Sequence, residues 1–413
     1  MSKPLSAARP NCVALPYGPI AILTGGFDKP YAYGIAMALV AQGLDVEVIG
    51  SDEIDSPELH STHGLRFLNL HGEWGSSVSR PRKLWRVAVF YARLIKYAAL
   101  GRTKIFHILW NNKIPLFDRT LLMLIYRAFG KSVVLTAHNV NAGERDGTDS
   151  LLNRLSLKSQ YRLVDHVFVH TNKMKQQLTA EYGVKPESVT VIPFGINNAV
   201  PHTGLGTAEA RCRLGIAENE KTILFFGNIR VYKGLHLLVE AFELLVGADS
   251  GPHRLIIAGS KPNAEGEQYW KDIQRRIECS GLGAKIVQKI QYIPDDETEI
   301  YFKAADVAVL PYTYISQSGV LSLSYSFGLP VIVTNVGSFK EEVVEGKTGF
   351  ICSAGSAAEV ARAIQIYFES DLYNYLDDKR EEIRSYATER FSWHVVGERT
   401  REVYARTLSG EPQ

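Results

Sequence analysis

Length, composition and charge place this chain among ordinary two-domain proteins. It has 413 residues, of which 46% are hydrophobic and 22% charged, and that length allows two domains with a core each. A formal net charge of +2 gives no overall field for nucleic acid, so no nucleic-acid partner is expected. The four cysteines form no CxxC pair, which argues against a disulfide framework or zinc cluster and favours a reducing cytoplasm. No apolar run reaches the roughly 18 residues of a spanning helix.

Short β-branched runs alternate with helix-length segments in the first half of the chain. Strands are expected at residues 20–24, 45–49, 106–109, 133–137, 166–169 and 189–192, and helices at 31–42, 116–129 and 173–182. Such alternation predicts a parallel sheet with helices on both faces.

The same alternation begins again in the second half. Strands are expected at residues 222–226, 254–258, 286–290, 307–310 and 331–334, and helices at 234–245, 269–281 and 319–327. Residues 195–206 between the two sets have linker composition. The fold class is therefore α/β, with two Rossmann-like doubly wound domains, 1–197 and 198–385, facing each other across a cleft where ligands bind.

The clearest chemical signal is the loop 227–234, which carries Arg230 and Lys233 between a buried strand and a helix that begins at Gly234. A diphosphate in this loop would meet backbone N–H groups, the positive end of a helix and two cations. Arg can bind two phosphate oxygens as a planar fork, whereas Lys acts as a point charge. The alternative is that both cations are simply solvated.

A second loop of small polar residues precedes the helix expected at 319–327. Its first turn, from Ser316 through Gln317, Ser318 and Gly319 to Val320, can offer free N–H groups to an anion. An ordinary serine-capped helix explains the same residues. Two weaker candidates also follow strands: Gly259-Ser260 for a phosphate, or a plain turn, and Ile293 for a nucleobase, or an ordinary loop.

At this point the chain resembles the family 4 (group 1) glycosyltransferases of the GT-B fold. The resemblance is carried by residues 191–196, by Gly227, Arg230, Lys233 and Gly234, and by the segments 305–312, 328–332 and 346–350. It implies a retaining transferase that moves a hexose from a nucleoside-diphosphate sugar, with Arg230 and Lys233 on the donor diphosphate and the backbone around Ile293 on the base. It also implies that a final helix, 386–413, crosses back to the N-terminal domain.

The resemblance assigns further residues to the N-terminal side. His138, after a strand, would face the donor sugar, and Gly25-Gly26 would line the acceptor side. Many family members carry two glutamates eight residues apart, where this chain has Ile315 and Leu323. The loop 316–319 then looks like a variant that holds diphosphate and sugar itself.

If the family mechanism holds, the leaving diphosphate helps to deprotonate the incoming hydroxyl, and no bound metal or other cofactor is required. An inverting reaction would instead need a general base, for which His138, Glu144, Asp146 and Asp28 are candidates. A non-catalytic nucleotide-sugar binder and a sugar-nucleotide epimerase remain alternatives. A dehydrogenase is disfavoured because residues 24–28 lack the GxGxxG spacing.

Residues 80–104 carry eight Lys or Arg and no acid, interleaved with aromatic and aliphatic residues. A basic amphipathic helix of this kind can lie on an anionic membrane. Alternatively, its apolar side packs on the sheet and its cations are solvated. Membrane docking would favour a lipid-linked glycan acceptor, surface-polysaccharide biosynthesis and a cytoplasmic protein held peripherally on the inner face of the cell membrane.

Overall fold

The computed structural model describes residues 18–26, 28–72, 80–145, 147–195, 200–248, 251–261 and 263–409. Two compact units share these residues: the first ends at Gly195 and resumes at Trp393, and the second runs up to Ser392. The domain boundary that we expected at 197/198 lies outside the described residues. The boundary expected at 386 falls inside α17 (Leu376–Phe391), because Ala387 and Phe391 are buried in the core of the second unit.

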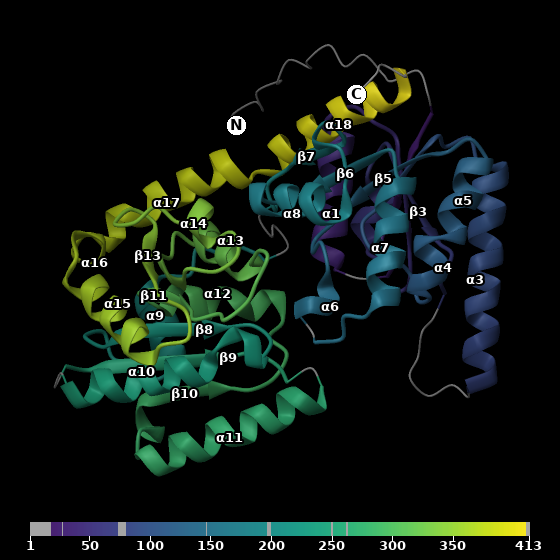
Figure 1. Ribbon diagram of the computed structural model, residues 1–413. Helices are drawn as coiled ribbons and strands as arrows, with labels where there is room; N and C mark the ends of the chain where they lie inside the picture. Colours follow the sequence, from purple (N-terminus) through teal and green to yellow (C-terminus); the bar gives the residue numbers. More distant parts are fainter. Residues whose placement is uncertain are drawn as a thin grey trace, which may run out of the picture. The chain divides into compact units, whose positions relative to one another are not determined.

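The first unit is a parallel sheet of seven strands in the order β3-β2-β1-β4-β5-β6-β7 (Figure 1). The strands are β1 (Ile20–Leu23), β2 (Val46–Gly50), β3 (Leu65–Asn69), β4 (Ile105–Ile108), β5 (Ser132–Thr136), β6 (His166–Val169) and β7 (Val189–Val191). The edge strand β3 was not predicted. Its only fully buried residue is Leu65, so it lacks the apolar run that marks the inner strands.

Helices cover both faces of this sheet, as the alternation predicts. They are α1 (Lys29–Ala41), α2 (Pro57–Ser61), α3 (Arg80–Leu100), α4 (Pro115–Arg119), α5 (Leu121–Ala128), α6 (Ala142–Arg145), α7 (Leu151–Leu163), α8 (Asn172–Tyr182) and α18 (Trp393–Ser409). The helix expected at 116–129 is interrupted at Thr120, whose backbone (φ −122°, ψ −86°) is not helical.

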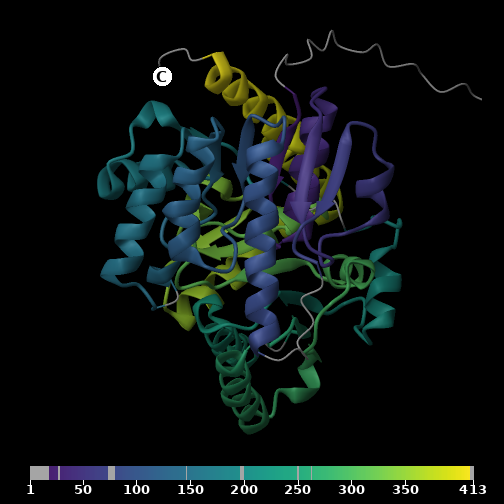
Figure 2. The same ribbon diagram turned by 90° about the vertical axis from the view of Figure 1, so that its right-hand side faces the viewer.

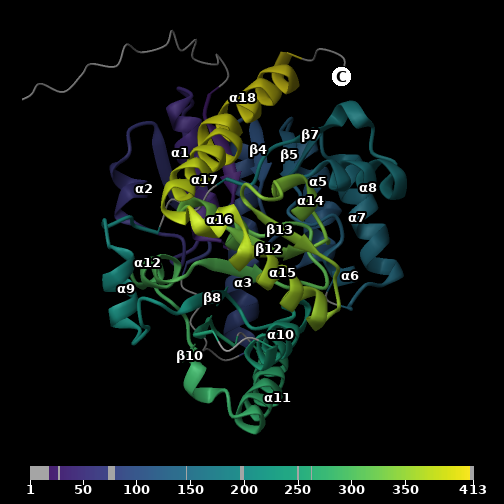
Figure 3. The same cartoon turned by 90° about the vertical axis from the view of Figure 1, so that its left-hand side faces the viewer.

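The two faces of β1 belong to different hydrophobic clusters. Ile20 and Ile22 pack with residues of α1 and α18, whereas Ala21 and Leu23 pack with residues of α3, α5 and α7, as the two-residue period of a strand requires. α18 lies beside α1 (Figure 3). A β-carbon on Gly34 of α1 would lie 2.1 Å from the Trp393 ring, so glycine is needed where the two helices meet.

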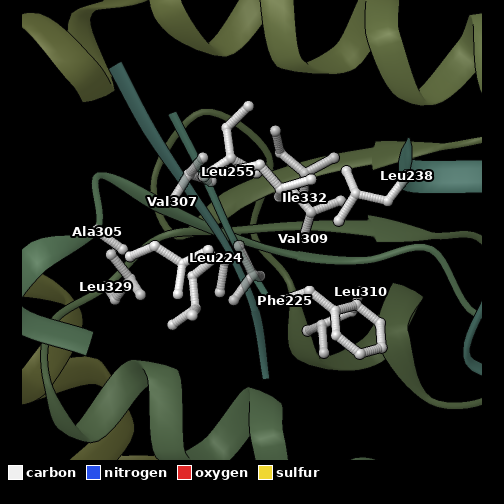
Figure 4. Packing of buried hydrophobic residues seen from close by; sticks show 14 of the residues in the cluster. Leu224, Phe225, Leu238, Leu255, Ala305, Val307, Val309, Leu310, Leu329 and Ile332 are labelled. Atoms are coloured by element: carbon white, nitrogen blue, oxygen red, sulfur yellow. The ribbon is translucent and has the colours of Figure 1, made fainter. Parts of the chain in front are cut away.

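The second unit is a parallel sheet of six strands in the order β10-β9-β8-β11-β12-β13. The strands are β8 (Lys221–Phe226), β9 (His253–Ala258), β10 (Ile286–Lys289), β11 (Val307–Leu310), β12 (Val331–Thr334) and β13 (Gly349–Cys352). Leu224, Phe225 and Val309 are among the buried side chains at its centre (Figure 4). The sequence prediction missed only β13, which is short, begins at a glycine and is half-buried at Phe350 and Ile351.

Helices also cover both faces of the second sheet. They are α9 (Thr207–Arg213), α10 (Leu235–Ala248), α11 (Ala264–Ser280), α12 (Asp295–Ala304), α13 (Gly319–Ser326), α14 (Phe339–Glu342), α15 (Ala357–Glu369), α16 (Asp371–Asn374) and α17. A buried ion pair joins α9 to the start of β11: Arg211 donates to both carboxylate oxygens of Asp306 at 2.8 and 2.9 Å. Asp306 also accepts from the Thr222 N–H, so its position is structural.

Candidate functional site

The strand order of the second sheet reverses between β8 and β11, and ligands of doubly wound sheets bind at such a reversal. Gly227 follows β8 and has φ 101°, a conformation that suits only glycine. A β-carbon on it would lie 2.9 Å from Nζ of Lys233 and 3.4 Å from Cγ2 of Val320. The two polar loops that were predicted separately from sequence therefore meet at Gly227.

Lys233 is the most unusual charge at this point. It ends the 3-10 turn η2 (Val231–Lys233), its side chain is 9% exposed, and Nζ lies 5.5 Å from the centre of the Tyr312 ring. Among the described residues it has no ion-pair partner. Burial, and then the charge of Arg230, lower the pKa of Lys233 to about 8. A buried ammonium without an anion is costly, and a bound anion removes that cost. Lys233 is thus not the solvated loop cation of the alternative interpretation.

One part of the predicted phosphate site is not present. α10 begins at Leu235, and the N–H of His236 in its first turn donates to the Tyr269 hydroxyl at 3.0 Å. Gly234 itself packs against Pro311, the residue after β11, because a β-carbon there would lie 2.0 Å from the Pro311 carbonyl oxygen. The start of α10 is therefore capped by α11, and the expectation of two open helix beginnings is wrong for this one.

The start of α13 differs from that of α10. Its N-cap residue, Ser318, is buried but makes no side-chain capping hydrogen bond. The helix begins at Gly319, so the first turn that we expected from Ser316 starts three residues later. The Ser316 carbonyl accepts from the Ser338 N–H at 3.2 Å. Oε1 of Gln317 is buried without a hydrogen-bond partner among the described residues, so this loop leaves one polar atom unsatisfied just before α13.

The weaker candidates lie at neighbouring strand ends. A β-carbon on Gly259, after β9, would lie 1.9 Å from the Gly227 carbonyl oxygen, so the two glycine loops are in direct contact. The Ser260 hydroxyl donates to Asn228 Oδ1 at 2.7 Å. Ile293, after β10, is buried, whereas its neighbour Tyr292 is 72% exposed. The side chain of Ile293 belongs to the core, which leaves only its backbone for a base.

The two positions at which the family resemblance led us to look for glutamates hold packing residues. Leu323 is buried in the core of the second unit, and Ile315 packs against that core. Neither position supplies a polar group. Hydrogen bonds to the sugar, which glutamates at these positions would make, must therefore come from the loop 316–320 or from other residues that contact the sugar.

In the first unit the strand order reverses between β1 and β4. Gly25 and Gly26 follow β1 with φ 61° and 79°. A β-carbon on Gly25 would lie 2.8 Å from the Asn111 carbonyl oxygen, so only glycine fits between the two loops. The Gly26 N–H donates to Thr24 Oγ1 at 3.2 Å. This is the same arrangement as at Gly227, and it is the point where a ligand of this unit would bind.

His138 follows β5, the strand next to β4. Its ring is stacked on Trp110, with 4.3 Å between ring centres and 6° between planes, and the Tyr31 ring meets it edge-on at 4.6 Å. Its Nε2 is buried and has no partner among the described residues. Burial, then the nearby His170 and His107, keep the pKa of His138 well below its ordinary value. A ring held neutral in this way is a weak base.

The other candidate bases are engaged in local structure. Asp28 caps α1 by accepting from the Tyr31 N–H at 3.2 Å, and Glu144 accepts from Asn141 at 3.2 Å. Asp146 lies outside the described residues. Within the described ranges, no three His, Cys, Asp or Glu residues are grouped as metal ligands.

Sequence reasoning missed His170, Trp110 and Tyr312. His170 directly follows β6. Tyr312 lies two residues beyond the end of β11, and Trp110 lies two residues beyond the end of β4. Each of the three has an aromatic or imidazole ring and follows the carboxyl end of a strand. Because the carboxyl ends of parallel strands lie at one edge of a sheet, this pattern could have identified them as site residues.

Comparison with known proteins gives the class of this protein. Residues 30–200 match the model of Glycosyltransferase Family 4, and residues 207–390 match that of Glycosyl transferases group 1. A D-inositol 3-phosphate glycosyltransferase from Corynebacterium diphtheriae is 24% identical over 401 residues, which are 92% of this chain and 89% of the relative.

Solved structures show the same two-domain fold. Sucrose-phosphate synthase from Thermosynechococcus elongatus has a TM-score of 0.75 at 19% identity, with 95% of this chain and 100% of that one covered. HepE from Anabaena, in complex with UDP and glucose, has a TM-score of 0.72 at 17% identity and covers 93% and 99%. The protein is a glycosyltransferase of the GT-B fold. It belongs, by its two matched domains, to the group 1 enzymes of family 4.

Proposed function

We propose that this enzyme moves a hexose from a nucleoside-diphosphate sugar onto a glycan hydroxyl, with retention of configuration, and that Lys233 is the centre of its donor site. The observation that supports this most is the buried Lys233 ammonium, which lacks an anionic partner among the described residues and lies next to Gly227. A diphosphate is the anion that the activity of the class supplies. Arg230, half-buried three residues earlier, would bind the same group, and the N–H groups of Gly319 and Val320 would add the positive end of α13.

The remaining donor contacts follow from the neighbouring loops. Gly259 and Ser260 would let the diphosphate approach the strand ends, the backbone of Ile293 would contact the base, and Ser316, Gln317 and Ser318 would serve the phosphates and the sugar. The two cations supply the counter-charge that a metal gives in other transferases, so we expect turnover to persist in EDTA. Gly25, Gly26 and His138 would form the sugar and acceptor side.

Retention is favoured by the state of the candidate bases. Asp28 caps a helix, Glu144 is hydrogen-bonded to Asn141, and His138 has a pKa far below that of an effective base at neutral pH. An inverting reaction needs such a base near the incoming hydroxyl. When the leaving diphosphate takes the proton instead, the enzyme contributes charge stabilisation and positioning. The anomeric proton signal of the product distinguishes the two outcomes.

The kind of acceptor that we propose follows from the exposed surface of α3. Phe90, Tyr91, Leu94 and Ala98 are buried against the sheet, but Leu84 is 72% and Trp85 69% exposed. Arg82, Lys83, Arg93 and Lys96 are exposed on the same helix, which in Figure 2 runs along the near side of the first unit. Apolar side chains among cations fit an anionic membrane surface. We therefore propose a lipid-linked glycan acceptor, in the synthesis of a surface polysaccharide. None of the described helices is long and apolar enough to cross a membrane.

The donor is tested first by ligand-induced stabilisation. Nucleoside diphosphates and their sugars with uridine, guanosine, adenosine and thymidine would be compared, because a selective ligand raises the melting temperature by mass action. UDP-glucose comes first, since HepE was solved with it. Release of nucleoside diphosphate only when an acceptor glycolipid is added supports transfer. Consumption of the donor without acceptor would indicate an epimerase, and binding without turnover a non-catalytic binder.

A further inference from the structure

Two histidines at neighbouring strand ends of the first unit form a chain of hydrogen bonds. Nδ1 of His138, after β5, lies 3.1 Å from Nε2 of His170, after β6. Nδ1 of His170 lies 3.2 Å from the carbonyl oxygen of Ile192. His170 is buried, and both rings contact Tyr31 and Phe194. This series of hydrogen bonds thus begins at a backbone carbonyl oxygen, which can only accept a hydrogen bond.

The protons in this chain follow from elementary hydrogen-bond chemistry. Because a carbonyl oxygen has no proton, Nδ1 of His170 must carry one. Burial lowers the pKa of His170 to about 4, so the ring is neutral at pH 7 and its Nε2 is a bare acceptor. His138 must then donate from Nδ1. Since His138 is also neutral, its Nε2 is left with a lone pair and no proton.

The His138 ring, at the other end of this series of hydrogen bonds, is held in one orientation. Stacking on Trp110 and the edge of Tyr31 fix the plane of the His138 ring, and a flip of the ring would break the bond to His170. Nε2 is buried without a partner among the described residues. An unsatisfied buried acceptor destabilises the free protein, and a ligand that donates a hydrogen bond to it recovers that cost.

We infer that His170 is a positioning residue that fixes the Nδ1–H tautomer of His138, so that Nε2 accepts a hydrogen bond from a sugar hydroxyl and rejects a carboxylate at that position. This inference rests on the proposed function for the identity of the ligand as a sugar. A carboxylate oxygen would face the Nε2 lone pair with no proton between them. The site therefore selects hexoses with a hydroxymethyl group over the corresponding uronic acids.

The tautomer is measured directly, without turnover. Protein labelled with ¹⁵N-histidine gives long-range ¹H–¹⁵N spectra in which protonated and bare ring nitrogens differ widely in shift, and a His138→Gln sample assigns the signal. We expect the Nδ1–H form in the wild type, a mixture in His170→Phe, and the wild-type form again in His170→Gln, whose side-chain oxygen can accept. His166→Phe is the matched control, because Nε2 of His166 bonds Thr190 instead.

The selectivity is measured with paired donors. We expect kcat/KM for a hexose donor to exceed that for its uronic acid by at least tenfold, and His170→Phe to lose most of that ratio while His170→Gln keeps it. A proton on Nε2 of His138 in the wild type, or an unchanged tautomer in His170→Phe, overturns the inference. So does an equal preference for both donors. If the tautomer is as expected but no nucleotide sugar binds, it is the proposed function that fails.

Discussion

The ε-ammonium of Lys233 lies 2.9 Å from the point that a β-carbon on Gly227 would occupy. A methyl carbon of Val320, in the first turn of α13, lies 3.4 Å from the same point. A diphosphate at this position would therefore meet a charge, a helix start and exposed backbone together. Two of the four predictions below test this site, and the other two test a buried carboxyl group of the second unit and the exposed face of α3.

Gly227→Ala is expected to weaken donor binding at least tenfold. The added methyl group would press on the Lys233 ammonium, and a φ of 101° is strained for alanine. Titration calorimetry with the selected nucleoside diphosphate measures the change. Gly247→Ala is the control, because it lies in α10 with nothing within 4 Å of the added carbon. Equal affinity in both variants would show that the backbone at Gly227 does not contact the donor.

Lys233→Met should raise the melting temperature of the free protein by a few degrees while weakening donor binding tenfold or more. Burial lowers the pKa of Lys233 to about 8, below its value in the unfolded chain. The penalty on folding is thus complete below pH 8 and is lost as the pH rises toward the unfolded value. The gain in melting temperature should accordingly be larger at pH 7 than at pH 10. A destabilised Met variant with normal affinity would remove Lys233 from the donor site.

Glu342→Gln should stabilise the second unit, and more so at pH 8 than at pH 5. Burial raises the pKa of Glu342 to about 8, so folding becomes less favourable as the pH rises from the unfolded pKa toward 8. A glutamine removes this dependence. Thermal unfolding at the two pH values measures it, with the exposed neighbour Glu341→Gln as control. Parallel shifts in both variants would contradict a buried, protonated Glu342.

Trp85→Ala is expected to reduce binding to vesicles that contain phosphatidylglycerol by roughly tenfold, with little effect on melting temperature because Trp85 is 69% exposed. Sedimentation with the vesicles at low and high salt separates the apolar contribution to membrane binding from the ionic contribution. Leu244→Ala, an exposed position on α10 of the other unit, serves as control. Wild-type protein that stays in the supernatant at low salt would refute membrane docking.

The sequence was sufficient for most of the fold because its inner strands are continuous apolar runs. β6, β11 and β12 have the predicted bounds, and the other predicted strands differ by a residue or two. The strands that were missed, β3 and β13, lie at sheet edges, where burial is incomplete and the apolar signal is weak. At the interruption the Thr120 hydroxyl donates to the Leu116 carbonyl at 2.6 Å, and the apolar periodicity of residues 116–129 does not mark this position.

The candidate site was only partly predictable. Arg230 and Lys233 could be identified because a glycine loop with cations is a local signal. The capping of α10 by Tyr269 could not be predicted, since 33 residues separate the Tyr269 hydroxyl from the His236 N–H that it accepts. The pairing of His138 with His170 was missed for the same reason: it arises from the order of strands in the sheet, not from spacing in the chain.

The packing of α18 on α1 has a consequence for synthesis on the ribosome. Tyr404 of α18 is buried, and its hydroxyl lies 2.5 Å from Nδ1 of His107 in β4. Part of one face of the first sheet, which α1 shares with α18, therefore stays uncovered until α18 has left the exit tunnel, after the whole second unit has been made. During synthesis of the second unit, the nascent first unit therefore exposes apolar surface, and chaperones commonly bind chains in this state.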